Sequence, residues 1–389
     1  MQKKNTDTVP GALDDIRILD LSIQIPGPYG SMILADLGAE VIKIEQPGVG
    51  DFARLLPSLF NGINRNKKSI ILDLKSPKGK AIVYKLAEHA DIVLEGFRPG
   101  VAKKLGIDYE TLKGINPKII YCSITGYGQD GPYKNISGHD INYQGISGLL
   151  SLTENLKASA DLSGIPLADI AGGMFAAISI LTALINRGRT GTGQYIDVSM
   201  TAGVFSWAST SLLAGFKELN NAESLYIPHY GIFKTKDDKF ITLGIIHEEH
   251  FWQNLCAVID LGTMKDLDLM ERIARRDEVL SALQTAFMTK TRKEWISLLN
   301  KADVPCSPVL TIEESFSDPQ IRHRNMVFEQ EHPVEGTIKQ RAFPAKFSDT
   351  QLKKDMPPPL YGQHTDEILL DLGYAQDDIK KLREEKVIA

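Results

Sequence analysis

Asp169 is the side chain in this sequence best placed to do chemistry. It directly precedes a long apolar stretch, 170–185, so it would sit at the mouth of a core helix. Partial burial there would raise its pKa and suit it to act as base, acid or nucleophile. Its position also fits a plain helix N-cap, which is the commoner role of an aspartate before a helix.

His139 is a second candidate for proton transfer. It lies in the segment Gly138-His139-Asp140-Ile141-Asn142-Tyr143, which we expect to be a loop. A neutral imidazole accepts protons near pH 7. A lone histidine is more often a structural hydrogen-bonding group, so both interpretations stay open at this point.

Three basic side chains, Lys75, Arg98 and Lys104, follow strand-like runs. Each alone is typical of a solvated surface. Together, at the ends of neighbouring strands, they could hold phosphates at one edge of a parallel sheet.

Two other motifs favour structural roles. The segment 126–131 matches GxGxxG, but no apolar-periodic helix follows it, so a glycine turn is expected rather than a nucleotide cradle. The run His247-Glu248-Glu249-His250 has its histidines three apart, which does not fit a zinc motif and suits the polar start of a helix.

The elements that must position these residues alternate along the first half of the chain. Short apolar runs typical of strands alternate with helical patterns, which predicts a parallel sheet covered on both faces. The strand-like runs are 16–22, 39–45, 69–74, 91–95, 118–124 and 194–200.

The pattern changes after about residue 224. A hairpin-like pair around 236–239 and four charged amphipathic helices between 249 and 301 predict a smaller α+β domain. We therefore expect a large Rossmann-like α/β domain begun by residues 1–205, a linker at 206–223, a small domain at 224–315, and a return of residues 316–389 to the large domain.

Composition excludes several classes of protein. The net charge of −5, with 44 basic and 49 acidic residues, gives no polybasic footprint for nucleic acid. The apolar stretch 170–185 is too short for a membrane span, and no apolar segment follows the first lysines. Three scattered cysteines suit reduced thiols. These features predict a cytoplasmic protein.

Several segments together resemble the class III coenzyme A transferases, the CaiB/BaiF type, whose members include carnitine-CoA transferases, formyl-CoA transferase and alpha-methylacyl-CoA racemase. The resemblance covers nearly the whole chain and follows the family order. The matching segments are PGPYGSMILADLGAEVIKIEQPGVGD, NKKSIILDLKSPKGK, ADIVLEGFRPGVAKKLGIDYETL, NPKIIYCSITGYGQDGP, ADIAGGMFAAISILTALINRGRTGTGQYIDVSM and YGQHTDEILLDLG. It implies the split large domain, a small α+β domain and two interlocked chains, hence a homodimer.

The resemblance also implies roles for individual residues. Asp169 matches the family aspartate, which is the nucleophile of the transferases and one of two bases in the racemase. Residues 138–143 are similar to the racemase loop that carries the second base, His139. Glu248 falls where the racemase has a glutamate that partners this histidine, although His247 and Glu249 depart from the usual neighbours.

These similarities favour a 2-methylacyl-CoA racemase that works by α-proton removal and return through His139 and Asp169. Backbone N–H groups at the start of the helix after Asp169 would stabilise the enolate. The alternative is a CoA transferase that moves CoA from an acyl-CoA to a free carboxylic acid through an Asp169 anhydride. Neither reaction needs a metal or a prosthetic group, since coenzyme A arrives with the substrate.

Contacts to coenzyme A carry over from the family by the same resemblance. One family arginine is replaced by Gln46, and Lys104 stands where another member has arginine, so it would pair a phosphate without the bidentate fork. The implied contact residues are Leu72, Lys75, Gly96, Phe97, Arg98, Lys104, Asp140 and Tyr143.

Overall fold

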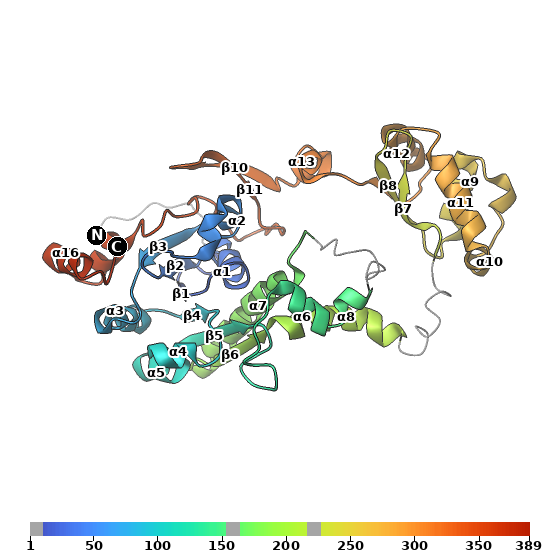
Figure 1. The fold of residues 1–389 in the computed structure, drawn as a ribbon. Coiled ribbons are helices and arrows are strands. Elements are labelled where there is room, and N and C mark those ends of the chain that lie inside the picture. Colours follow the sequence, from blue (N-terminus) through green and yellow to red (C-terminus); the bar gives the residue numbers. More distant parts are fainter. Residues whose placement is uncertain (1–10, 153–163, 216–226) are drawn as a thin grey trace. The chain divides into compact units, whose positions relative to one another are not determined.

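The protein is described from a computed structural model that places residues 11–152, 164–215 and 227–389 (Figure 1). Contacts within the chain divide it into two units. The large unit comprises Met1–Ser211 and Asn325–Ala389, and the small unit is Leu212–Arg324. The boundaries predicted from sequence lie at 205/206, 223/224 and 315/316.

A six-stranded sheet forms the centre of the large unit, and all of its neighbouring strands are parallel. The strand order is β3-β2-β1-β4-β5-β6, which is the doubly wound order of Rossmann-like domains. Leu19 pairs with Ile42 on one side and with Val93 on the other. The strands are β1 (Arg17–Asp20), β2 (Glu40–Glu45), β3 (Lys67–Ile71), β4 (Ile92–Glu95), β5 (Ile120–Thr125) and β6 (Tyr195–Ser199).

Both faces of this sheet are buried, because successive side chains of each strand point to opposite faces. Ile18 joins one apolar core with α1 and α7, and Leu19 joins the other with α3. The helices before the small unit are α1 (Pro26–Asp36), α2 (Pro57–Ile63), α3 (Pro77–Glu88), α4 (Val101–Leu105), α5 (Tyr109–Ile115), α6 (Asp140–Ile146), α7 (Leu167–Thr190) and α8 (Met200–Gly215), with single 3₁₀ turns at η1 (Phe52–Leu55) and η2 (Leu149–Leu152).

Helix α7 packs unusually close to α1. A Cβ added to Gly173 would meet the carbonyl oxygen of Pro26 at 2.5 Å, and one added to Gly30 would meet that of Gly173 at 2.8 Å. Glycines at these positions therefore let the two backbones touch. Helix α7 is long and apolar enough to cross a membrane by length and composition alone. In the large unit its small residues instead lie in the core, as the sequence predicted.

The C-terminal segment completes the large unit. Helices α15 (Thr365–Asp371) and α16 (Gln376–Glu384) bury Ile368, Leu369, Ile379 and Leu382 in the core that also contains Leu19. Figure 1 shows α16 beside the β3 end of the sheet. A hairpin of β10 (Val327–His332) and β11 (Gly336–Arg341) precedes these helices.

The small unit has its own core of a three-stranded antiparallel sheet and helices. The strands are β7 (Tyr230–Lys234), β8 (Phe240–Gly244) and β9 (Cys306–Pro308), in that order. Buried Trp252 and Trp295 anchor the helices to this sheet. The helices are α9 (Glu249–Ile259), α10 (Leu269–Ala274), α11 (Arg276–Phe287), α12 (Arg292–Lys301), α13 (Ile312–Ser315) and α14 (Pro319–His323), with a 3₁₀ turn at η5 (Gly262–Met264). The predicted mixed α/β architecture is thus confirmed.

Candidate functional site

A cavity of about 580 Å³ opens at the carboxyl ends of β1, β4 and β5 in the large unit. From β1 the chain continues to β2 on one flank, and from β4 it continues to β5 on the opposite flank. The gap between β1 and β4 is therefore the switch point at which such sheets bind ligands. Ser22 and Gln24 follow β1, Arg98 follows β4, and Asp169 enters the same cavity from α7.

Asp169 does not cap α7, contrary to the simplest expectation from its position. The helix begins at Leu167, so Asp169 lies within its first turn. Asp140 provides the cap from a distant part of the sequence, because its Oδ1 accepts hydrogen bonds from the backbone N–H groups of Ala168 at 2.7 Å and Asp169 at 3.3 Å. The Asp169 side chain is therefore left available to the cavity.

The same contacts bear on the expectation that N–H groups at the start of α7 would stabilise an enolate. Those of Ala168 and Asp169 already donate to Asp140, and that of Ile170 donates to the carbonyl oxygen of Pro166. A substrate oxygen would have to displace one of these acceptors.

Burial, together with the nearby charge of Asp140, raises the pKa of Asp169 to about 7. A carboxylate in the first turn of a helix would ordinarily be stabilised by the helix dipole, but burial and a like charge outweigh that effect here. No hydrogen bond or ion pair to its carboxylate occurs among the described residues. Asp169 is thus a partly buried acid that can be either ionised or protonated near neutral pH.

His139 lines the same cavity as Asp169. The segment predicted as a loop instead begins α6, with His139 in the N-cap position and exposed to solvent. Its backbone N–H donates to Oδ1 of Asn142 at 2.9 Å, which fixes the start of the helix. The hydroxyl of Tyr143 donates to the carbonyl oxygen of Gly138 at 2.5 Å, and the ring of Tyr143 packs edge-on against Tyr127.

The side chain of Glu95, at the end of β4, binds the loop that carries Arg98. Its carboxylate accepts hydrogen bonds from the backbone N–H of Phe97 at 2.6 Å and from the hydroxyl of Ser123. Burial raises the pKa of Glu95 to about 7. Gly96, Phe97 and Arg98 all line the cavity above it.

Comparison with known proteins identifies the family. The family model for CoA-transferase family III matches residues 13–365. This chain belongs to CoA-transferase family III. Human succinyl-CoA:glutarate CoA-transferase is 35% identical over an alignment of 378 positions that covers 92% of this chain and 86% of that protein. Human alpha-methylacyl-CoA racemase is 34% identical over an alignment of 393 positions that covers 97% of each chain.

A solved structure gives the same result. The crystal structure of a CaiB/BaiF family protein from Brucella suis matches with a TM-score of 0.83 and 32% identity, over 93% of this chain and all of that one. The resemblance predicted from sequence is therefore confirmed, and this family III protein is an enzyme of the transferase or racemase type.

The cavity of this family III protein gathers only part of the predicted site. Asp169, His139, Gly96, Phe97, Arg98 and Tyr143 line it. Asp140 lies behind it as the cap of α7. Leu72 is buried after β3, whereas Lys75 and Lys104 are exposed and outside the cavity lining.

Glu248 belongs to the small unit and is described there by itself. It is the N-cap residue of α9, and its Oε2 accepts hydrogen bonds from the backbone N–H groups of Ile246 and His247 at 3.0 and 3.1 Å. These hydrogen bonds hold the pKa of Glu248 below its usual range. The run 247–250 thus forms the polar start of a helix, as predicted, and the described residues contain no cluster of three metal-ligating side chains.

Sequence reasoning missed two features of this site. Lys134 adds a second cation to the cavity lining, in the loop that follows the GxGxxG segment. That segment is a turn after β5 with no helix behind it, as predicted, and a cation beyond a strand end was a usable signal. The wall formed by Ser22 and Gln24 had no comparable signal, because neither residue type suggests a ligand.

Proposed function

We propose that this protein transfers coenzyme A between an acyl-CoA and a free carboxylic acid, with Asp169 as the nucleophile. The observation that carries the proposal is the Asp169 carboxylate, which lines the cavity without a hydrogen-bond or ion-pair partner among the described residues. Arg98 and Lys134 share the cavity and can attract the phosphates and carboxylates of the substrates.

The reaction balances with Asp169 as its only covalent participant. A carboxylate oxygen of Asp169 attacks the thioester carbonyl and the C–S bond breaks. CoA departs as the thiolate, and an acyl-aspartyl anhydride forms on the enzyme. The thiolate then attacks the aspartyl carbonyl, which gives an Asp169–CoA thioester and releases the first acid. The acceptor carboxylate reverses these steps, and Asp169 is restored as a carboxylate.

The acceptor is a small carboxylic acid in this proposal. Succinate and glutarate are the first acids to test, because the human transferase at 35% identity is named for them. The relatives support acyl-CoA thioesters as donors in the same way.

A second candidate function rests on His139. It lines the same cavity as Asp169, whose pKa near 7 suits an acid that returns a proton. In a 2-methylacyl-CoA racemase one of the pair would remove the α-proton and the other would reprotonate the opposite face. In this racemase, Glu248 would be the residue that orients the imidazole, as the family resemblance implies.

We also propose a homodimer in the cytoplasm. Met174, Ile178 and Ile185 recur at helical spacing on one side of α7 and are exposed, the last two by 53% and 62%. Such an apolar stripe on a long core helix suits burial against a second copy of the chain. In that arrangement the hydrophobic helix needs no membrane.

Two variants separate the candidate functions. Asp169→Asn removes the nucleophile and should lower the rate of transfer by about three orders of magnitude or more. His139→Ala should leave substantial transfer. Exposed Asp130→Asn on the neighbouring loop is the matched control and should stay active. Hydroxylamine or borohydride should trap an adduct at Asp169 after addition of acyl-CoA. The transferase proposal would be contradicted if the wild type formed no adduct and the His139→Ala variant lost all activity.

A further inference from the structure

Residues 22–24 form a wall of the cavity in an unusual backbone conformation. Gln24 has φ 62°, in the left-handed region that residues other than glycine rarely adopt. Its backbone N–H donates to Oδ1 of Asp51 at 2.9 Å. A strained residue at a cavity persists only where its surroundings hold it in place.

Asp51 and Lys43 hold this wall from two sides. Nζ of Lys43 lies 2.8 Å from Oδ2 of Asp51, and both side chains are 0% exposed. The same Nζ donates to the carbonyl oxygen of Ser22 at 2.9 Å. The pair therefore binds the N–H of Gln24 and the carbonyl of Ser22 at the same time.

A second buried ion pair fixes the start of the wall. Asp20 accepts hydrogen bonds from the backbone N–H of Ser22 at 3.0 Å and from its hydroxyl. Nζ of Lys67 lies 3.2 Å from Asp20. Burial alone would lower the pKa of Lys43, but the carboxylates of Asp20, Asp51 and Glu45 raise it above its usual value, so Lys43 carries its charge.

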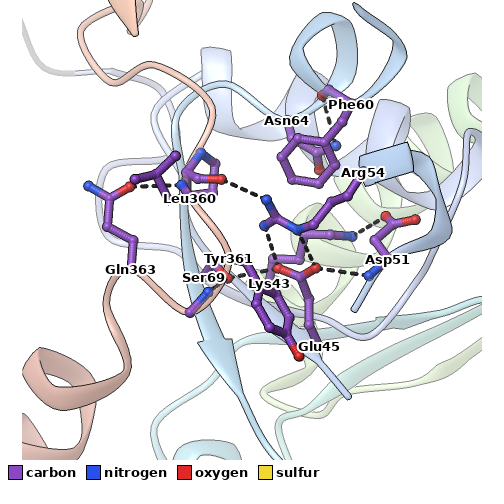
Figure 2. Close-up of polar contacts among 12 residues, drawn as sticks. Lys43, Glu45, Asp51, Arg54, Phe60, Asn64, Ser69, Leu360, Tyr361 and Gln363 are labelled. Atoms are coloured by element: carbon purple, nitrogen blue, oxygen red, sulfur yellow. Dashed lines mark hydrogen bonds and ion pairs between the residues drawn. The ribbon is translucent and has the colours of Figure 1, made fainter. Parts of the chain in front are cut away.

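The C-terminal segment lies beside this cluster, as Figure 2 shows. Glu45 accepts hydrogen bonds from the backbone N–H of Asp51 at 2.9 Å and from Nη2 of Arg54 at 2.6 Å. Nη1 of Arg54 donates to the carbonyl oxygen of Pro359 at 3.1 Å, and the hydroxyl of Tyr361 donates to that of Gln46 at 2.7 Å. The returning chain thus packs against the residues that hold the cavity wall.

We propose that Asp51 and Lys43 are positioning residues that keep the wall at 22–24 in the shape that binds the coenzyme A thioester. A fully buried ion pair contributes little net stability, because the cost of removing both charges from water offsets their attraction. Its hydrogen bonds to a strained cavity wall give it a defined geometric task instead. The inference rests on the proposed function for the identity of the ligand.

The test compares this pair with a buried ion pair elsewhere in the large unit. Asp51→Asn keeps an acceptor for Gln24 but breaks the ion pair, Asp51→Ala removes both, and Lys43→Met removes the donor to Ser22. Asp36→Asn is the matched control, because Asp36 and Arg65 form a buried pair at 2.5 Å and neither lines the cavity. Amide hydrogen exchange of residues 22–27, thermal unfolding and calorimetric titration with coenzyme A are measured for each variant.

Asp51→Ala and Lys43→Met should speed exchange at 22–27 and weaken coenzyme A binding by about tenfold or more, as expected when a binding wall shifts. Asp51→Asn should lie between them and wild type, and it supplies the test if Asp51→Ala does not fold. Asp36→Asn should lower the melting temperature without changing either readout. The proposal would be overturned if the Asp51 and Lys43 variants exchanged the amide hydrogens of residues 22–27 as slowly as wild type and bound coenzyme A with unchanged affinity.

These readouts do not depend on turnover. A wild type that binds coenzyme A but catalyses neither reaction overturns the proposed function alone. If the wild type does not bind coenzyme A, the exchange of 22–27 in the variants still decides whether the pair positions this wall.

Discussion

The carboxylate of Asp140 caps the helix that carries Asp169 and lies close enough to raise the pKa of its side chain. A residue implied by family resemblance to contact coenzyme A thus also contacts the backbone of the proposed nucleophile. The arrangement links the stability of the α7 N-terminus to the charge state of Asp169.

Asp140→Asn should shift the pH dependence of the reaction. Asparagine keeps an oxygen for the N–H of Ala168 but removes the negative charge, so the pKa of Asp169 should fall from about 7 toward its usual value. Because transfer needs the ionised carboxylate, the acidic limb of kcat/KM should move to lower pH. The measurement is a pH profile of kcat/KM from about pH 5 to 9, a range that spans this pKa.

Asp140→Ala is the companion variant, which also loses the cap. It should destabilise the protein by about 0.5–2 kcal/mol in urea unfolding. An acidic limb that stays in place in both variants would show that Asp140 does not tune Asp169.

Glu95 should make the protein less stable as the pH rises. Its pKa is about 7 in the folded chain against an ordinary value of 4.5, so the folded state binds more protons between those values. Stability from this group is therefore fully present below pH 4.5 and is lost as the pH rises through about 7. Glu95→Gln should flatten this dependence in urea unfolding at several pH values.

Exposed Glu88→Gln serves as the control for Glu95 and should leave the dependence unchanged. If wild type and Glu95→Gln lose stability equally between acidic and mildly alkaline pH, the buried carboxyl is not the cause.

Arg98→Ala should weaken coenzyme A binding by about 1.5–3 kcal/mol, the usual worth of a hydrogen bond to a charged group. Arg98 lines the cavity, whereas Lys75 and Lys104 lie outside its lining. Calorimetric titration at low salt, with Lys75→Ala alongside, separates the cation in the cavity lining from one outside it. An unchanged dissociation constant for Arg98→Ala would move the binding site away from this edge of the sheet.

Ile178→Glu should disturb the proposed dimer, because it places a charge in the exposed apolar stripe of α7. Analytical ultracentrifugation should show a dimer for wild type and monomer or loss of soluble protein for the variant. Exposed Thr285→Glu on α11 of the small unit, outside that stripe, is the control and should remain dimeric. A wild type that is an active monomer at nanomolar concentration would contradict the dimer.

The sheet and the helices near it could be predicted from sequence, because strand and helix patterns depend on local spacing. Arg98 could be placed at the ligand edge of the sheet because parallel strands end there, whereas the pairing of His139 with Asp169 came from the family resemblance. The cap supplied by Asp140 could not, because it joins residues 28 positions apart.

The buried pair of Lys43 and Asp51 was equally hidden from sequence reasoning. Lysine and aspartate on a strand and in a turn suggest a solvated surface, and only the fold shows that both are 0% exposed. Burial of charges depends on tertiary packing, which residue type and spacing do not reveal.

One measurement tests the transferase proposal most directly. The wild-type protein and the variants Asp169→Asn and His139→Ala are incubated in heavy water with 2-methylacyl-CoA and ¹³C-labelled succinate or glutarate, and the thioesters are followed by mass spectrometry. The proposal predicts a ¹³C-labelled acyl-CoA whose formation depends on Asp169 and not on His139. Deuterium at the α-carbon of the original thioester, with no labelled acyl-CoA formed, would contradict it and favour the racemase.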